Sequence, residues 1–94
     1  MNVRRLRLDV DWAGEGPRID AIGEAIAGVD GVEALLFTVT EVDMETIGSD
    51  VTVEGTQLDP AAILAAIEAS GAVVHSIDEL AAGERALTFT PRAR

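Results

Sequence analysis

The chain has 94 residues, of which 17 are acidic and seven are basic, so its formal net charge at pH 7 is −10. This charge repels phosphate backbones and anionic lipid surfaces, which argues against nucleic acid and membrane partners and favours cations or basic partners. The absence of cysteine excludes disulfides and thiolate chemistry, and no apolar run approaches the roughly 18 residues that cross a bilayer, so we expect a cytoplasmic protein.

The first part of the chain predicts a strand, a helix and a second strand. Strict alternation of apolar and charged residues indicates a half-buried strand over residues 5–12. A glycine-rich turn ends this strand, and Pro17 suits the first turn of a helix that ends near Gly28. Residues 29–32 are expected to form a turn, and alternation then predicts a second strand that runs to about Asp43.

A hairpin and a second helix are expected next. Residues 46–49 resemble a hairpin connection, which leads to a shorter third strand that stops at Gly55. Asp59 followed by Pro60 is a specific helix-start signal, because Asp caps the free N–H groups and Pro needs none. Gly71 suits the left-handed residue that ends this helix.

The C-terminal part predicts a fourth strand over residues 73–77. Residues 78–85 fit no single element. Leu87 and Phe89 alternate with polar residues and indicate a short terminal strand, whereas residues 91–94 are expected to form a frayed tail.

The order β-α-β-β-α-β is the ferredoxin-like pattern. We therefore expect one α+β domain over residues 1–90, with an antiparallel sheet of strand order 4-1-3-2, both helices on one face, and a short extra C-terminal strand. The opposite face of the sheet would then be bare.

Charged residues alternate along this predicted bare face. A simple register places Arg7 near Glu54 and brings Asp9 and Asp11 toward Asp50. Carboxylates on adjacent strands, about 5–7 Å apart, can share Ca²⁺ or Mg²⁺ through oxygen ligands. Asp9, Asp11 and Asp50 are therefore candidate metal ligands, although a solvated acidic face is the interpretation that we favour.

A second acidic alternation, at Glu41, Asp43 and Glu45, continues the phase of the predicted second strand. In that phase these side chains project toward the helices unless a β-bulge inverts them. Glu41 and Asp43 are candidate metal ligands. They rank below the first set, because the segment lacks the calcium-loop pattern of alternating acids, central Gly and closing Glu.

His75 is the single histidine and another secondary metal candidate. If Val74 and Ser76 face the core, His75 emerges beside Asp9, where the pair could orient a proton or a ligand. If instead Val73 and Ile77 face the core, His75 is a buried packing residue. We favour the second arrangement.

Enzyme chemistry has little support in this sequence. One histidine, no cysteine and no G-x-S-x-G motif leave no nucleophile–base set. Gly14-Glu15-Gly16 lacks the spacing and the lysine of a phosphate-binding loop. The predicted bare face also lacks the aromatic and basic residues that RNA-reading ferredoxin-like domains use.

All seven basic residues are arginine, and the chain has no lysine. Together with abundant Ala, Gly, Val and Thr, this composition resembles that of proteins from a high-salt cytoplasm, especially in haloarchaea. Concentrated salt would screen the self-repulsion that the net charge causes. An ordinary acidic domain is the alternative.

Several strings resemble the archaeal family DUF211, whose function is unknown. The most specific is Val74-His75-Ser76-Ile77-Asp78-Glu79 with Ala82-Gly83; the weaker ones are Arg4 to Val10, Glu41 to Thr46 and Val51 to Gly55. The resemblance implies a ferredoxin-like fold, archaeal origin and a homo-oligomer, for which a ring is one form. It supplies no catalytic residues. Members of the family are usually richer in lysine. This chain departs from them because its basic residues are all arginine, which fits a haloarchaeal protein.

Two functions follow as hypotheses. The first is a non-enzymatic domain that assembles with copies of itself, either through exposed sheet edges or by packing of the bare face. The fourth strand or residues 78–90 could supply the joining edge, and cations at Asp9, Asp11 and Asp50 would neutralise repulsion. The second is a sensor that binds a small effector at a subunit interface, with residues 11–16 and 28–31 as candidate loops. An enzyme using carboxylate-bound Mg²⁺ is a third, less favoured, possibility.

Overall fold

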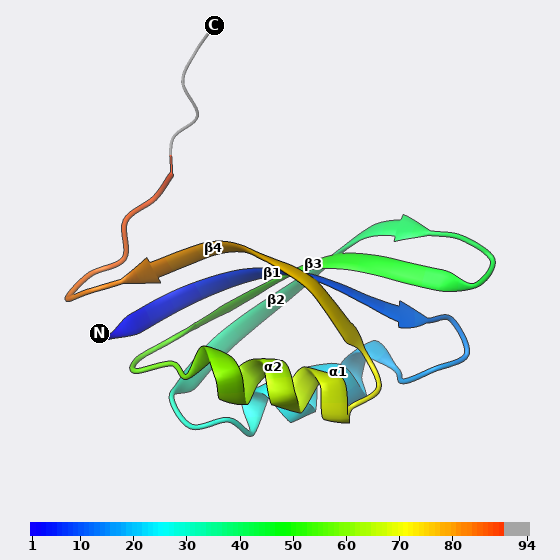
Figure 1. Ribbon diagram of the computed structural model, residues 1–94, viewed down its shortest axis with the longest axis horizontal. Helices are drawn as coiled ribbons and strands as arrows, with labels where there is room; N and C mark the ends of the chain where they lie inside the picture. Colours follow the sequence, from blue (N-terminus) through cyan, green and yellow to red (C-terminus); the bar gives the residue numbers. More distant parts are fainter. Residues whose placement is uncertain (90–94) are drawn as a thin grey trace, which may run out of the picture.

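A computed structural model describes residues 1–89 of the chain as two helices packed on one face of a four-stranded antiparallel sheet (Figure 1). The strand order is β2-β3-β1-β4, which confirms the predicted order 4-1-3-2 and the ferredoxin-like α+β class. The elements are β1 (Val3–Ala13), α1 (Ile19–Ala27), β2 (Val32–Val42), β3 (Thr46–Gly55), α2 (Pro60–Ala69) and β4 (Val73–Ala82).

β1 is longer than predicted at both ends, and two other strand boundaries differ more. β3 begins at Thr46, so the segment expected as a hairpin connection is paired strand and the turn is three residues long, 43–45. β4 continues to Ala82 rather than ending at Ile77, because β-bulges let the chain stay paired with β1 although its alternation is broken.

The core lies between the two central strands and the helices. Leu8 and Val10 of β1 lie opposite Val51 and Ser49 of β3, and all four side chains are fully buried. Burying each aliphatic side chain of this size contributes roughly 1.5–3 kcal/mol to stability. The helical residues that close this core are Ile22, Ile26, Ile63 and Ile67.

Aromatic packing extends the core toward β2. The rings of Trp12 and Phe37 meet edge to face, with centroids 6.4 Å apart and an interplanar angle of 74°, a favoured arrangement for aromatic pairs. Gly23 of α1 lies against Leu35 and Phe37, so this helix covers the part of β2 that it crosses.

Helix α2 begins and ends as its sequence predicts. Asp59 accepts a hydrogen bond from the Ala62 amide at 3.3 Å, and Pro60 takes the first helical position. Gly71 follows the helix with φ of +102°, a left-handed conformation that glycine adopts without steric cost.

The short strand expected at Leu87 and Phe89 does not form. Residues 86–89 are irregular, and the chain leaves β4 at Gly83, where φ is +120°. The segment then crosses the uncovered face of the sheet, where Arg5 donates a hydrogen bond to the Leu87 carbonyl. The alternating pattern therefore has no strand partner among residues 1–89. The tail expected at 91–94 lies outside the described residues.

Candidate functional site on the open face of the sheet

The sheet face opposite the helices, which we call the open face, carries the charged residues that the alternation predicted. Asp9 of β1 lies directly across from Asp50 of β3, and Asp11 lies across from Gly48. The expected pairing of Arg7 with Glu54 is wrong. The residue opposite Glu54 is Arg5, which lies two residues earlier on the same face of β1. Alternation fixes which side chains share a face of the sheet, but it does not fix the stagger between β1 and β3, because α1 and β2 separate these two strands in the chain.

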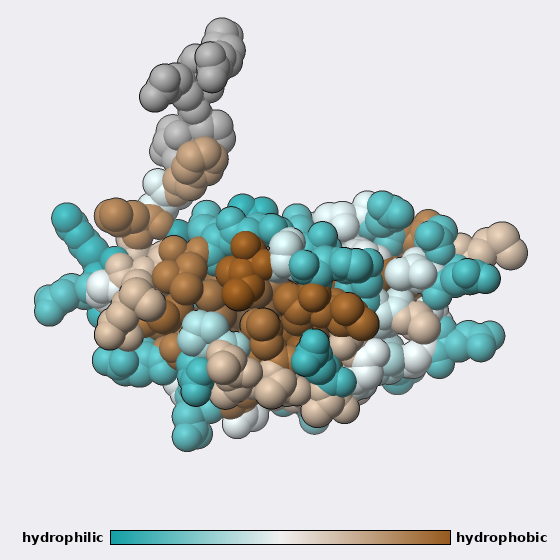
Figure 2. Space-filling model, in the orientation of Figure 1, coloured by the Kyte–Doolittle hydropathy of each residue, from teal (hydrophilic) through white to brown (hydrophobic). Residues whose placement is uncertain are grey.

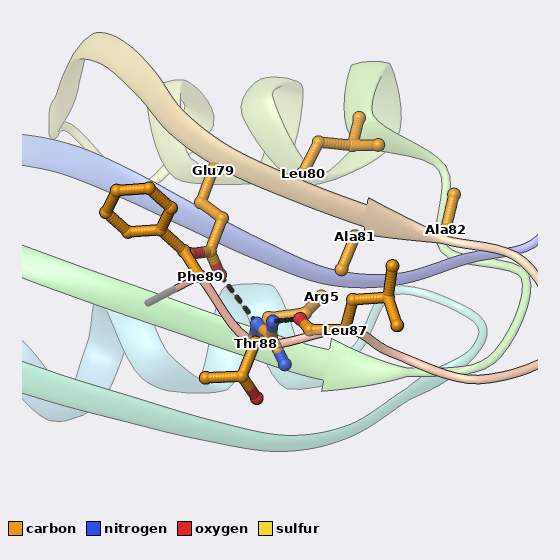
Figure 3. A pocket seen from close by; sticks show the side chains of 8 residues that line it. All are labelled: Arg5, Glu79, Leu80, Ala81, Ala82, Leu87, Thr88 and Phe89. Carbon is orange, nitrogen blue, oxygen red and sulfur yellow. Dashed lines mark hydrogen bonds and ion pairs between the residues drawn. The ribbon is translucent and has the colours of Figure 1, made fainter. Parts of the chain in front are cut away.

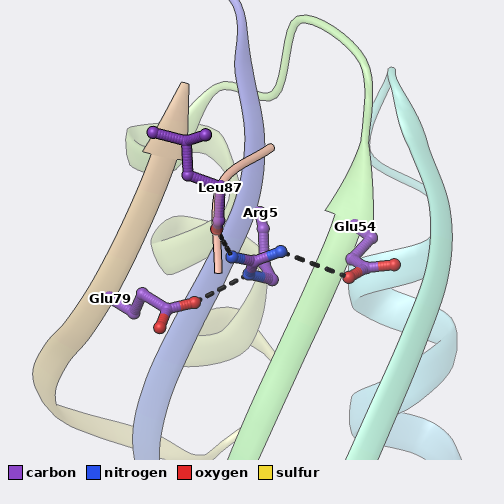
Figure 4. A network of polar contacts seen from close by, with 4 residues as sticks. All are labelled: Arg5, Glu54, Glu79 and Leu87. Carbon is purple, nitrogen blue, oxygen red and sulfur yellow. Dashed lines mark hydrogen bonds and ion pairs between the residues drawn. The ribbon is translucent and has the colours of Figure 1, made fainter. Parts of the chain in front are cut away.

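Arg5 is the centre of a polar network at one end of the open face (Figure 4). Its Nε donates to Glu79 of β4 at 2.7 Å, its Nη1 lies 3.9 Å from Glu54 of β3, and its Nη2 donates to the Leu87 carbonyl. The Arg5 side chain is only 14% exposed. One guanidinium thus links three segments, which its fork of five donors permits.

Asp50 is neutralised in part by an arginine of the neighbouring strand. Its carboxylate lies 3.9 Å from the Arg7 guanidinium, and both side chains are half exposed. Asp50 does not line the hollow in which Asp9 and Asp11 lie. Of the three predicted ligands, Asp9 and Asp11 line the hollow, while Asp50 lies across from Asp9 but outside the hollow.

A hollow of about 280 Å³ lies at the other end of the open face, and we call it the acidic hollow. Its lining combines three carboxylates, one imidazole and two hydroxyls, from all four strands. The lining residues are Asp9, Asp11, Thr40, Glu41, Thr46, Gly48 and His75.

A β-bulge brings Glu41 into this hollow. Val39 pairs with Ser49 but Glu41 pairs with Gly48, so the register shifts between them. The shift turns Glu41 onto the same face as Asp11, which is the inversion that the sequence allowed but could not place.

Gly48 forms the floor of the acidic hollow. A Cβ at this position would lie 3.2 Å from the Asp11 Oδ1 and 3.6 Å from the Glu41 Cβ. The missing side chain lets carboxylates from β1 and β2 share one depression across β3. The sequence pattern assigned Gly48 to the hairpin connection at 46–49, whereas it lies inside β3, where a glycine signals a close approach of other groups.

His75 lies on the open face, so the favoured prediction that it is buried is wrong. Its Nε2 lies 2.7 Å from the Asp11 Oδ2, and Asp11 rather than Asp9 is its partner. Register shifts in β4 explain the error: Val74 pairs with Val10 and packs against the core, yet Ile77 also pairs with the core residue Leu8. No single alternating phase describes this strand.

Asp43 has a structural position in the β2–β3 turn rather than in the hollow. Its Oδ1 accepts hydrogen bonds from the Glu45 and Thr46 amides, each 2.8 Å long. These bonds, the one from Glu45 first, hold the pKa of the Asp43 carboxyl below its usual value, because they stabilise its charged form. Asp43 therefore fastens the hairpin.

The acidic hollow is not a preformed metal centre by geometry. Among residues 1–89, no three Asp, Glu or His side chains converge closely enough to bind one ion together. Its oxygen-rich lining is chemically suited to hard cations, which accept water as a further ligand. The arrangement can therefore attract hydrated cations, whereas direct coordination would require side chains to move.

The two loops considered for an effector do not converge. Gly14 at one end of β1 donates to the Glu45 carbonyl of the hairpin. At the other end of the fold, Gly31 accepts from the Thr56 amide and packs tightly against Gly55, where an added Cβ would clash.

The fold and its open face define a ferredoxin-like α+β domain with an acidic hollow on the uncovered side of the sheet. The DUF211 family, described as an uncharacterised ArCR, matches residues 4–93, and the chain belongs to this family. It is also 35% identical to the uncharacterised protein MJ0319 of Methanocaldococcus jannaschii, over 98% of this chain and 96% of that protein. Both findings confirm the family resemblance and an archaeal relative. No helix in the described part of the chain is long and apolar enough to cross a membrane.

Proposed function

We propose that this protein is a non-enzymatic, self-assembling cytoplasmic domain whose copies join through the free edges of the sheet. The observation that carries the proposal is that each edge strand of the sheet leaves backbone hydrogen-bonding groups unpaired. β2 and β4 each pair with one neighbour only in the four-stranded sheet. Their unpaired N–H and C=O groups are available to a strand of another copy.

Exposed apolar side chains on both edge strands support this proposal. Figure 2 displays an apolar area between β4 and α2 in the face toward the viewer. Single exposed apolar residues are ordinary, but a series along an edge marks an interaction surface. The exposed members are Leu36, Val39 and Val42 on β2, and Val73, Ile77 and Leu80 on β4.

The net charge of −10 opposes assembly, because each added copy brings the same charge. We therefore include cations in the proposal. The carboxylates of Asp9, Asp11 and Glu41 around the acidic hollow, with Asp50 beside them, would concentrate K⁺, Ca²⁺ or Mg²⁺ and lower this repulsion.

Adaptation to concentrated salt is part of the same proposal. Screening by KCl would stabilise both the folded monomer and the assembly, since the Debye length falls to about 3 Å at 1 M. The arginine-only composition supports this view.

Light scattering coupled to gel filtration tests the proposal. The mass should exceed that of the 9.8 kDa chain several-fold in concentrated KCl and should rise further with Ca²⁺ relative to a chelator. A monomer under every condition would contradict assembly. An oligomer whose mass is the same with and without Ca²⁺ would contradict a role of divalent cations but would leave self-assembly in place.

A further inference from the structure

The C-terminal arm, which we define as residues 84–89, has a strand pattern but no strand partner. Leu87, Thr88 and Phe89 alternate apolar and β-branched polar side chains, a pattern typical of a half-buried strand. In the structure these residues are irregular and pair with none of the four strands.

The start of the arm is held in place. The Gly83 amide donates to the Asn2 carbonyl at 2.8 Å, and Arg4 Nε donates to the Gly83 carbonyl at 2.6 Å. Beyond Gly83 the arm passes over Arg5, and a hollow of about 340 Å³ separates it from the end of β4 (Figure 3).

The apolar side chains of the arm are not covered by their own domain. Leu87 is 70% exposed and Phe89 is 73% exposed. An exposed Phe and Leu two residues apart form an amphipathic segment that would gain stability from burial elsewhere.

The free edge of β4 offers a surface that fits such a segment. Ile77 and Leu80 are 46% and 44% exposed. They pair with the core residues Leu8 and Leu6, so they lie on the helix side of the sheet, and the partly buried Leu64 of α2 also packs against the core on this side. We call Leu64, Ile77 and Leu80 the β4 strip. Figure 2 shows an apolar area between β4 and α2 on the face toward the viewer.

Charge complements the apolar match. By sequence, residues 85–94 contain three arginines and no acidic residue, whereas residues 1–84 contain four arginines and all 17 acidic residues, a net −13. Asp78, between Ile77 and Leu80, and Glu68, one turn after Leu64, are exposed. The arm itself has no net charge, because Glu84 and Arg85 cancel, but by sequence it leads into the basic end of the chain. That basic end is attracted to the acidic body, and the attraction would favour contact of the arm with the β4 strip.

We propose that the C-terminal arm of one copy adds to the free edge of β4 in a second copy, with Leu87 and Phe89 packing on the β4 strip. This inference rests on the proposed self-assembly and names the segment that performs it. Main-chain hydrogen bonds to the β4 edge would supply affinity, and the alternating side chains would supply specificity, as in other cases of strand addition.

Point variants of the full chain test the arm. The double substitution of Leu87→Ser and Phe89→Ser should reduce the assembly to the monomer mass in concentrated KCl, while circular dichroism stays unchanged because both side chains are exposed. Met44→Ser is the matched control, since it removes an exposed apolar side chain from the hairpin tip and should leave the mass unchanged.

Cross-linking tests the strip, because a chain without cysteine reports introduced pairs unambiguously. One preparation would carry Leu87→Cys and the other Ile77→Cys; mixed and oxidised, they should form a disulfide-linked pair, whereas Val42→Cys mixed with Leu87→Cys should not. The inference would be overturned if the mixture of Leu87→Cys and Ile77→Cys chains gave no linked pair and a disulfide formed only within a single chain that carries both substitutions.

The two proposals can fail separately. A wild-type monomer in all salts would reject self-assembly and the arm contact together. A wild-type oligomer whose mass survives the double substitution would overturn the arm contact and leave assembly through other edges in place.

Discussion

β1 and β2 are both eleven residues long and rich in aliphatic side chains, yet they have opposite environments. β1 pairs with β3 on one side and β4 on the other, and it buries every second residue over most of its length. β2 is an edge, and its residues from Thr38 onward are exposed. In Figure 1 the β2–β3 hairpin projects past the ends of the helices.

The difference shows that apolar residues in a strand are not buried by their local pattern alone. Leu8 alternates with charged residues and is buried, because it has helices above it and strands on both sides. Leu36 lies in an apolar run between Leu35 and Phe37, yet it is exposed because it lies on the open face of an edge strand. Apolar residues that the monomer leaves exposed are the ones that a partner could use.

Truncation of these two leucines is the strongest test of the comparison. Leu8→Ala should lower the free energy of unfolding by about 2–5 kcal/mol, because it opens a cavity in a fully buried site. Leu36→Ala should change it by less than about 1 kcal/mol. Denaturant unfolding in concentrated KCl measures both; equal losses would mean that β2 is buried in solution.

Arg5 and Arg7 offer the next contrast. Arg5→Ala should cost about 1.5–3 kcal/mol, because it removes charged hydrogen bonds and leaves the partly buried Glu79 unpaired. Arg7→Ala should cost about 0–1 kcal/mol, since its ion pair with Asp50 is half exposed and 3.9 Å long. Thermal melting of both variants checks the order, and a larger loss for Arg7 would contradict the network in Figure 4.

A smaller contrast involves two serines. Ser49 is buried and its Oγ donates to the Val10 carbonyl at 3.0 Å, so Ser49→Ala should cost about 1 kcal/mol. Ser76 on β4 is exposed and bonds only to Asp78 in the described part of the chain, so Ser76→Ala should stay within about 0.5 kcal/mol. Chemical denaturation distinguishes them.

The smallest expected effect is local to the hairpin tip. The lowered pKa of Asp43 means that its charged form stabilises the turn above about pH 4 and that this contribution is lost as pH falls through the lowered pKa. Asp43→Ala should therefore speed amide exchange at Glu45 and Thr46 at neutral pH, whereas Asp43→Asn, which keeps an acceptor, should speed it less. Unchanged exchange in both variants would show that the turn holds without the side chain.

Much of the fold was predictable because its signals are local. Asp59 and Pro60 start α2, Gly71 ends it, and the alternation in β1 separates its two faces without reference to other segments. Part of the site was predictable for the same reason, since the open-face position of Asp9 and Asp11 follows from that alternation.

The errors share a different origin. His75 and Glu41 reach the open face through register shifts in β4 and β2. Arg5 rather than Arg7 meets Glu54 because of the stagger between β1 and β3, two strands that are not consecutive in the chain. A bulge changes every pairing beyond it, and neither a bulge nor the stagger of non-consecutive strands leaves a firm mark in a single sequence.

Sequence alone thus determined the charge balance, the order of elements and the two faces of β1, because these depend on residue type and period. Tertiary structure decided which carboxylates share the acidic hollow, which arginine joins three segments, and which apolar residues remain exposed. These depend on strand register and on position within the sheet, which arise only when distant segments pair.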